Sequence, residues 1–303
     1  MNISSMIMRS LLFVPGHSDK LLQSAARSDA DVLILDVEDS VLPESNKIIA
    51  RENIKKYVKS GAFSKFGVFI RLNERNSGHL LADVTELAID GVDGFLYSKT
   101  YDKEDVVFFD RLLECIEHTK GFSPGKFKII PILETAASIV NSDAISKAST
   151  RVVTIGFGSE DFVSDMGAIR DFDDGVSIAS ARAWVAMVAR ANKMNPIDAA
   201  YIHVHDLVGL ENHLRKGRLL GYSGMWTLHP NQIELVNKYY SPSETEVADA
   251  LDILRINELA RKSDRGVAII EGKFVGPPLV VSARKIIDKS NSIKAQRAEA
   301  KGK

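Results

Sequence analysis

The chain has 303 residues, of which 45% are hydrophobic and 26% are charged, and its formal net charge is −1. This composition is ordinary for a globular protein with a large core, so it argues against disorder. A net charge near zero provides no global field for nucleic acid or an anionic membrane, and no stretch reaches the roughly 20 apolar residues of a membrane span. We therefore expect a cytoplasmic protein with neither partner.

Eight short runs of β-branched and aliphatic residues recur along the chain, each followed by a longer segment with helical periodicity. The runs are Arg9–Val14, Val32–Val37, Gly67–Leu72, Gly94–Ser98, Phe127–Leu133, Arg151–Gly156, Ala200–Val204 and Gly224–Leu228. Most are continuously apolar, which is typical of strands buried on both faces of a parallel sheet. Eight such units predict an α/β fold, a closed (β/α)8 TIM barrel over residues 1–240, rather than a doubly wound open sheet.

The helical segments between the runs are amphipathic, and the clearest are Glu44–Lys59, Asp102–His118 and Ser177–Lys193. Ser18, Ser77, Asp102 and Ser177 lie where helix starts are expected. The single cysteine, Cys115, lies in the second of these segments. One cysteine excludes an intrachain disulfide, and because free cysteines are commonly buried we interpret it as a packed apolar residue rather than a nucleophile.

Residues 241–290 predict a C-terminal helical extension that covers the barrel rim or reaches a neighbouring subunit. It contains a strong helix at Ser243–Lys262, whose first residues form a capping-box pattern, a loop at Gly272–Pro278 and a last helix at about Leu279–Asp288. Residues 291–303 are polar and charged, and we predict a disordered tail there.

Ionisable residues follow nearly every run, at the strand ends where a barrel of this kind carries its active site. A purely structural barrel has no need of them, because buried charge is costly unless it is paired or bound to metal. The residues concerned are His17, Lys20, Asp36, Glu38, Asp39, Arg71, Asn73, Lys99, Glu134, Glu160, Asp161, His203, His205 and His229.

Glu134 ends one apolar run, and Asp161 follows the next run after a turn that contains glycine. Two carboxylates from neighbouring strands suit Mg²⁺, which takes one or two protein carboxylates and completes its shell with water and substrate oxygens. The His/Cys cluster expected of zinc is missing here. We therefore predict a Mg²⁺ site on Glu134 and Asp161; in the alternative, one of the two simply pairs with Arg71 or Lys99.

Arg71 ends an apolar run and is predicted to face the barrel mouth. A guanidinium group there can bind a substrate carboxylate through two hydrogen bonds. The alternative is an internal partner among Asp36, Glu38 and Asp39. Both readings can hold together, because an anchored arginine is better preorganised.

Four histidines are possible acid–base groups: His17, His203, His205 and His229. His229 precedes Pro230, and we favour a structural role in a turn for it. His203 and His205 alternate on the predicted seventh strand, so they would share a face. The sequence leaves open whether one of them faces the site.

Seven sequence strings occur together in order. They are RSLLFVPGHSDK (9–20), LDVEDSV (35–41), the Lys47 and Ala50-Arg51 pair, RLN (71–73), PILET (131–135), GFGSEDF (156–162) and LHPNQI (228–233). With them the chain resembles the citrate lyase β-subunit-like family, the acyl-CoA lyase branch of the HpcH/HpaI aldolase superfamily, from Arg9 to about Lys285.

The resemblance implies a carbon–carbon lyase with Mg²⁺ on Glu134 and Asp161 and a substrate-carboxylate arginine at Arg71. Its substrate would be a short carboxylated hydroxyacyl-CoA such as citryl-, malyl- or citramalyl-CoA, and some family members hydrolyse related thioesters. The resemblance also implies a homotrimer or hexamer whose C-terminal segment lids a neighbour's site. The loop Pro15–Lys20 and the Lys47/Arg51 helix would lie toward the CoA. Our candidate catalytic residues are Arg71, Glu38, Asp39, His17 and His203, and our candidate substrate-binding residues are Arg71, Lys20, Lys99, Gly158, Ser159 and Glu160.

Three positions depart from the family pattern. Gly276 stands where acyl-CoA lyase members carry a lid aspartate two residues before a proline. His203 stands where an acidic residue is usual, and His17 where asparagine is frequent. These departures keep two alternatives open: a metal-dependent aldolase or lyase of a free 2-keto or hydroxy acid without CoA, and a non-catalytic scaffold or lyase-complex subunit that uses an acyl-carrier partner.

Overall fold

The computed structural model describes residues 6–172, 175–262, 268–270 and 273–301. The chain forms two compact units, Met1–Asn237 and Lys238–Lys303. Within the described residues, none of the helices combines the length and apolarity needed to cross a bilayer.

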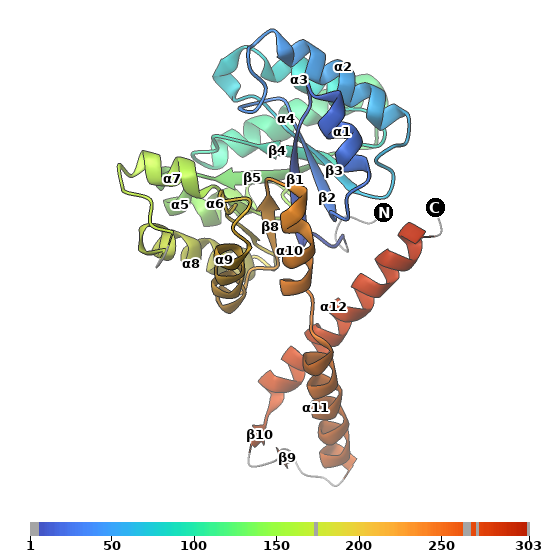
Figure 1. Ribbon diagram of the computed structural model, residues 1–303, viewed down its shortest axis with the longest axis vertical. Helices are drawn as coiled ribbons and strands as arrows, with labels where there is room; N and C mark the ends of the chain where they lie inside the picture. Colours follow the sequence, from blue (N-terminus) through green and yellow to red (C-terminus); the bar gives the residue numbers. More distant parts are fainter. Residues whose placement is uncertain (1–5, 173–174, 263–267, 271–272, 302–303) are drawn as a thin grey trace. The chain divides into compact units, whose positions relative to one another are not determined.

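The first unit contains a closed barrel of eight parallel strands in the order β1 to β8, which confirms the predicted fold (Figure 1). The strands are β1 (Ser10–Pro15), β2 (Val32–Asp36), β3 (Gly67–Arg71), β4 (Gly94–Tyr97), β5 (Lys128–Leu133), β6 (Gly156–Phe157), β7 (Ile197–Asp198) and β8 (Gly224–Thr227). The α-helices are α1 (Asp19–Ala26), α2 (Asn46–Lys59), α3 (Leu80–Leu87), α4 (Lys103–Lys120), α5 (Ala136–Val140), α6 (Ser142–Lys147), α7 (Ser159–Asp165), α8 (Val176–Ala191), α9 (Leu207–Leu220) and α10 (Ile233–Tyr239), and the 3₁₀ turns are η2 (Arg75–Ser77) and η3 (Pro230–Gln232).

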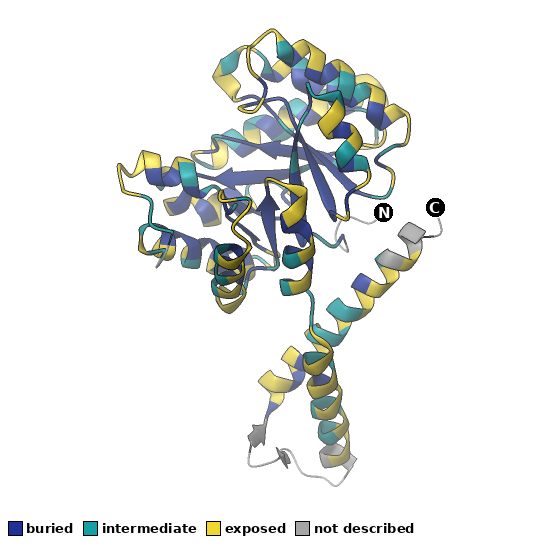
Figure 2. Ribbon diagram, viewed as in Figure 1, coloured by how far each residue is buried: buried dark blue, intermediate teal, exposed yellow. Residues whose placement is uncertain are grey.

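The barrel has two hydrophobic cores, one inside the strands and one between the strands and the helices. Side chains alternate across each strand, so the two cores take alternate residues. The inner core consists of Met6, Leu11, Val32, Ile34, Phe69, Leu96, Ile130, Ile132, Ile197 and Trp226. Figure 2 shows the strands buried and the helices exposed on their outer sides. Helix starts follow the sequence signals at Ser18 and Asp102, whose side chains accept backbone hydrogen bonds from the first helical turn.

Two predicted strands are misplaced. The sixth strand is not Arg151–Gly156 but Gly156–Phe157, and Val152 makes only an isolated parallel bridge with Ile129. The seventh is Ile197–Asp198, so the predicted strand Ala200–Val204 is wrong. Strand β7 pairs with Gly156 of β6 and with the first two residues of β8, so its ladder is short. The predicted run at residues 200–204 lies beyond that ladder and forms a connection. The two histidines in that run therefore share no strand face.

Cys115 corrects another expectation, because it is exposed rather than packed. It lies in the second half of α4. Helices in a βα unit run back from the strand ends that carry the active site, so Cys115 lies toward the opposite end of the barrel. This position gives no support to a nucleophilic role.

The second unit contains α11 (Glu244–Lys262), β9 (Ala268–Ile270), β10 (Lys273–Val275) and α12 (Pro277–Lys301). Helices α11 and α12 contact each other extensively, and β9 pairs with β10 in antiparallel fashion. The predicted capping box is present: the Ser243 N–H donates to Glu246 at 2.8 Å, and the Glu246 N–H donates to Ser243 Oγ at 3.1 Å.

Two expectations for this unit are wrong. The predicted loop at Gly272–Pro278 is largely β10 and the start of α12, although Gly272 itself lies outside the described residues. The predicted disordered tail, residues 291–303, is helical as far as Lys301. Residues 289–301 contain no proline or glycine and include three alanines and three lysines, whose helix propensity is high.

A buried ion-pair cluster holds the start of β5 against α4. The Arg151 guanidinium contacts Glu117 at 2.5 Å and Asp110 at 2.6 Å, and it also donates to the Phe127 carbonyl at 3.1 Å. Arg151 and Glu117 are almost fully buried. Because β5 continues from this cluster to the barrel mouth, the cluster helps to fix the register of that strand.

We predict that Arg151→Met lowers the free energy of unfolding by about 3–5 kcal/mol, because it leaves the buried Glu117 carboxylate without its cation. Urea unfolding followed by circular dichroism measures the change. Arg111→Met is the matched control, since Arg111 also contacts Asp110 but is 69% exposed, and it should change stability by less than about 0.5 kcal/mol. Equal losses in both variants would contradict the structural role of the cluster.

Candidate metal and carboxylate site at the barrel mouth

The functional side chains continue the inner face of the barrel. Because alternate residues share a face, the positions two residues beyond the inner-core residues of β2, β3 and β5 also point inward. These positions are Asp36, Arg71 and Glu134. Asp36 pairs in register with Pro15 of β1 and with Arg71 of β3, so these ends lie at one level. The sequence prediction that these groups meet at the barrel mouth is therefore consistent with the strand register.

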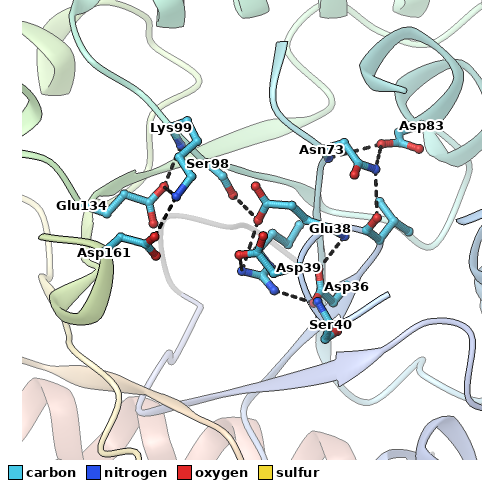
Figure 3. Close-up of polar contacts among 12 residues, drawn as sticks. Asp36, Glu38, Asp39, Ser40, Asn73, Asp83, Ser98, Lys99, Glu134 and Asp161 are labelled. Carbon is cyan, nitrogen blue, oxygen red and sulfur yellow. Dashed lines mark hydrogen bonds and ion pairs between the residues drawn. The ribbon is translucent and has the colours of Figure 1, made fainter. Parts of the chain in front are cut away.

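Arg71 is held by three carboxyl groups, those of Asp36, Glu38 and Asp39, which are labelled in Figure 3. Its Nε and Nη2 bind the two oxygens of Asp36 at 2.8 and 2.5 Å, and its Nη1 lies 3.1 Å from both Glu38 and Asp39. The guanidinium also stacks on the Phe13 ring, 5.0 Å from its centroid. The structure therefore contains the internal pairing of Arg71 that we gave as the alternative to substrate binding. Asp39 is 62% exposed, so it is the partner that an incoming carboxylate could displace.

Glu38 is buried between Arg71 and Ser98, whose Oγ donates to Glu38 Oε2 at 3.0 Å. Burial raises the pKa of Glu38 to about 8; Arg71 opposes this, and the carboxylates of Asp39, Glu134 and Asp36 add to it. Glu38 therefore tends to keep its proton to a higher pH than an exposed carboxyl group does.

Glu134 and Asp161 both contact one cation, the ammonium of Lys99 (Figure 3). Lys99 Nζ lies 2.9 Å from Asp161 Oδ1 and 3.8 Å from Glu134 Oε1, and the Lys99 backbone N–H donates to the same Glu134 oxygen at 2.7 Å. Glu134 is buried, which raises its pKa to about 7, whereas Asp161 is half exposed in the first turn of α7. In the structure, Glu134 and Asp161 therefore pair with Lys99, as in the alternative to a metal site.

The donor set nevertheless fits a hard divalent cation. Five carboxyl groups meet two cationic side chains at this mouth, namely Asp36, Glu38, Asp39, Glu134 and Asp161 against Arg71 and Lys99. The raised pKa values of Glu38 and Glu134 reflect both their burial and this excess of negative charge. Among the residues that the structure describes, no three His, Cys, Asp or Glu side chains form a metal cluster. A two-carboxylate site with open positions suits Mg²⁺ better than a closed zinc site.

Gly158 allows Glu134 its position. A Cβ atom at residue 158 would lie 2.6 Å from Glu134 Cβ and 3.1 Å from its Oε2. The two neighbouring residues, predicted to bind substrate, are already engaged: buried Ser159 donates to Glu160 at 2.9 Å, and Glu160 pairs with Arg170 at 2.9 Å. Sequence reasoning missed Arg170, because it lies in an irregular segment after α7.

A second polar network lies behind the site and includes Lys47 and Arg51. Lys47 is buried, and its ammonium donates to Asn73 Oδ1 and to the carbonyls of residues 37 and 38. Asn73 donates in turn to Asp83 at 2.7 Å, and Arg51 pairs with Asp83 at 2.9 Å. The Lys47 and Arg51 side chains are thus internal supports of the loop after β2.

The predicted histidines do not join the carboxylate cluster, since none of the polar contacts of Arg71, Lys99, Glu134 or Asp161 within the described residues involves one. His17 is half-buried, and its Nδ1 is buried without a hydrogen-bond partner. Exposed His203 packs against the Phe172 ring, and His205 against the ring of His229. Lys20 is exposed on α1.

His213 was not singled out from the sequence, and it is the buried histidine of the barrel wall. Burial lowers its pKa to about 4, with nearby Arg182 acting in the same direction. Its Nε2 lies 3.1 Å from the Ala199 carbonyl. We interpret it as a neutral structural residue, since it lies on the α9 face that contacts the end of β7.

Comparison with known proteins agrees with this geometry. The family model described as HpcH/HpaI aldolase/citrate lyase matches residues 9–230. L-malyl-CoA/beta-methylmalyl-CoA lyase from Cereibacter sphaeroides is 30% identical over 95% of this chain and 96% of its own. Citrate lyase subunit beta from Haemophilus influenzae is 26% identical over 94% of this chain and 97% of its own.

Solved structures give the same picture. The protein CitE from Mycobacterium tuberculosis, in complex with magnesium, acetoacetate and coenzyme A, has a TM-score of 0.73 at 25% identity, covering 95% of this chain and 99% of that chain. A citrate lyase from Burkholderia xenovorans has a TM-score of 0.80 at 21% identity, covering 98% of this chain and 93% of that chain. At that identity the second match supports the fold alone.

We predict that Gly158→Ala weakens Mg²⁺ binding at least about tenfold and lowers stability by about 1–3 kcal/mol, because the added methyl group displaces Glu134. Calorimetric titration with Mg²⁺ and urea unfolding measure the two effects. Gly167→Ala is the control: its φ of +60° makes alanine strained, but a Cβ there meets nothing within 4 Å. If both variants lose metal affinity equally, general destabilisation rather than the Glu134 contact is responsible.

A second prediction concerns Glu38. Its pKa is about 8 in the folded chain and about 4.5 when unfolded, so the folded state keeps a proton that the unfolded state releases. Its contribution to stability therefore falls as the pH rises from the unfolded value through about 8. Glu38→Gln should gain stability relative to the wild type as the pH rises from about 4.5 to about 8, measured by urea unfolding. For Glu104→Gln, a change at an exposed position, the free energy of unfolding plotted against pH should run parallel to that of the wild type. A parallel plot for Glu38→Gln would refute the raised pKa of Glu38.

Proposed function

The chain belongs to the HpcH/HpaI aldolase/citrate lyase family of carbon–carbon lyases, and we propose that it is a Mg²⁺-dependent enzyme that cleaves or forms the C–C bond of a short carboxylated hydroxyacyl-CoA. Citryl-, malyl- and citramalyl-CoA are the candidate substrates. One observation carries the proposal: the Glu134/Asp161 carboxylates and the anchored Arg71 converge on one barrel mouth. A hard-cation site beside a carboxylate-binding arginine suits a substrate that offers both a chelating oxygen and a carboxylate.

The names of the relatives support this chemistry. One acts on malyl-CoA and β-methylmalyl-CoA, and another was solved with magnesium, acetoacetate and coenzyme A together. The proposed homotrimer or hexamer follows from the family resemblance, and the cytoplasmic location follows from the composition of the sequence; both remain predictions.

The residues would divide the reaction as follows. Arg71, held at two atoms by Asp36, binds the substrate carboxylate as Asp39 moves aside. Mg²⁺ held by Glu134 and Asp161 would supply Lewis-acid stabilisation of the negative charge that develops on the substrate oxygen. The Phe13 ring beneath the Arg71 guanidinium packs against inner-core Trp226, with 5.6 Å between the ring centroids, and so supports Arg71 from the apolar side. Glu38 holds a proton on its carboxyl group beside Arg71, and we assign it the role of proton carrier.

Two observations favour a second candidate, a lyase of a free 2-keto or hydroxy acid without CoA. Gly276 stands at the lid position where the family resemblance implies an aspartate. In addition, Lys47 and Arg51, which we expected near the CoA, are buried in internal contacts. Calorimetry with CoA and acetyl-CoA separates the candidates, because only the thioester enzyme should bind them. A subunit that depends on an acyl-carrier partner would turn over neither substrate class on its own.

We predict that Glu134→Gln abolishes most turnover and weakens Mg²⁺ binding by more than the roughly tenfold effect of losing an outer-sphere contact. The assay is release of acetyl-CoA or a related thioester from a panel of hydroxyacyl-CoA substrates with and without Mg²⁺, followed by the same screen with free keto acids. Glu104→Gln, an exposed change of the same kind, is the control. Unchanged Mg²⁺ affinity in Glu134→Gln, or no turnover of any substrate by the wild type, would count against the proposal.

A further inference from the structure

Lys99 makes two separate contacts to Glu134. Its backbone N–H donates to Glu134 Oε1 at 2.7 Å, and its ammonium lies 3.8 Å from the same oxygen and 2.9 Å from Asp161 Oδ1. The two carboxylates proposed as metal ligands therefore share one residue of this chain as their cationic partner (Figure 3).

The backbone of Lys99 is adapted to this contact. Its φ of +50° lies in the left-handed region, which is uncommon for a residue with a side chain. Thr100 Oγ1 donates to the Tyr97 carbonyl at 3.1 Å and so closes the turn around Lys99. Backbone strain of this kind persists where the surrounding structure holds it in place, and it occurs often at functional sites. Here the turn directs the N–H and the ammonium of one residue to the same carboxylate.

The ammonium and a divalent cation cannot both stay between these carboxylates. An ion bound to Glu134 and Asp161 would lie within a few ångströms of Lys99 Nζ, and like charges repel strongly in a site that is largely removed from water. The Lys99 side chain is 24% exposed, so it has a route toward solvent. Binding of the metal therefore has to move the ammonium away.

We propose that Lys99 is a resident counter-ion that Mg²⁺ displaces, and that the displaced ammonium then binds an anionic group of the substrate. This inference rests on the proposed function. Lys99 follows β4, between Arg71 at the end of β3 and Glu134 after β5, so a displaced ammonium remains at the same mouth. Mg²⁺ and an anionic substrate would thus bind cooperatively, because the anion stabilises the form in which the carboxylates are free for the metal. The substrate would carry a negative group for Lys99 in addition to the carboxylate that Arg71 binds.

Calorimetry tests the exchange directly. Mg²⁺ is titrated into the wild type, Lys99→Met, Lys99→Arg and Lys103→Met, a matched lysine that is 59% exposed on α4. Lys99→Met should bind Mg²⁺ alone at least about tenfold more tightly than the wild type, because no tethered cation competes. Lys103→Met should stay within about twofold of the wild type, because its charge is exposed and screened. Lys99→Arg keeps the competing positive charge, so its affinity for Mg²⁺ should not rise above that of the wild type.

The second readout is the coupling between Mg²⁺ and malonate, an unreactive dicarboxylate. Saturating malonate should tighten Mg²⁺ binding to the wild type, after correction for Mg²⁺–malonate association in solution, and the same factor should appear when the titration is reversed. In Lys99→Met the factor should fall at least about threefold below the wild-type factor, because only direct contact between the bound metal and malonate still couples them. Lys99→Asn, whose side chain tolerates a positive φ, provides the same readouts if the methionine variant does not fold.

The outcomes separate the two proposals. If the wild type binds no Mg²⁺, the proposed metal site fails, and the exchange fails with it. If the wild type binds Mg²⁺ but Lys99→Met binds it equally or more weakly, Lys99 supports the carboxylates and the exchange is refuted. If the variant binds Mg²⁺ more tightly but keeps the malonate coupling, the role of Lys99 toward the substrate is overturned.

Discussion

The excess of carboxyl groups at the barrel mouth is the constraint on which the rest of the site depends. Five carboxyls and two cations lie at the ends of adjacent strands, and burial makes each uncompensated negative charge costly. The chain meets this cost in two ways. Glu38 stays protonated, and Lys99 lies between Glu134 and Asp161. Both are arrangements that a divalent cation or an anionic substrate can change, so the electrostatic cost is linked to binding.

The surrounding fold makes this arrangement rigid. Asp36 fixes Arg71 at two atoms. The buried ammonium of Lys47 binds the backbone carbonyls of residues 37 and 38, which directly follow Asp36. Gly158 leaves the space that Glu134 fills on the neighbouring strand. The metal candidates thus come from different elements, and the carboxyl groups of the mouth that are open to solvent are Asp39 and Asp161.

Sequence reasoning succeeds where local pattern and barrel geometry agree. Continuous apolar runs locate β1 to β5 and β8, and the inward-facing position after each run identifies Asp36, Arg71 and Glu134. It fails where an apolar run lies outside the residues that pair in the sheet. This is the case at β7, whose short ladder depends on β6 and β8. Nor does the sequence show the partners of Lys47, because they include residues distant in the sequence such as Asn73. A charged residue on an amphipathic helix cannot be told from a ligand contact until those partners are placed.

The family resemblance implies a lid aspartate at the position of Gly276, and its absence would change which group can move a proton. With Gly276 there, that position supplies no carboxylate, and the histidines make no contact with the carboxylate cluster in the described structure. Glu38 has the properties such a group needs: it is buried, it has a pKa of about 8, and it contacts the arginine that would bind the substrate. A proton carrier inside the barrel would require no acid from a neighbouring subunit. Assembly and chemistry would then be separable in this chain, whereas a lid acid supplied by a neighbour would make them interdependent.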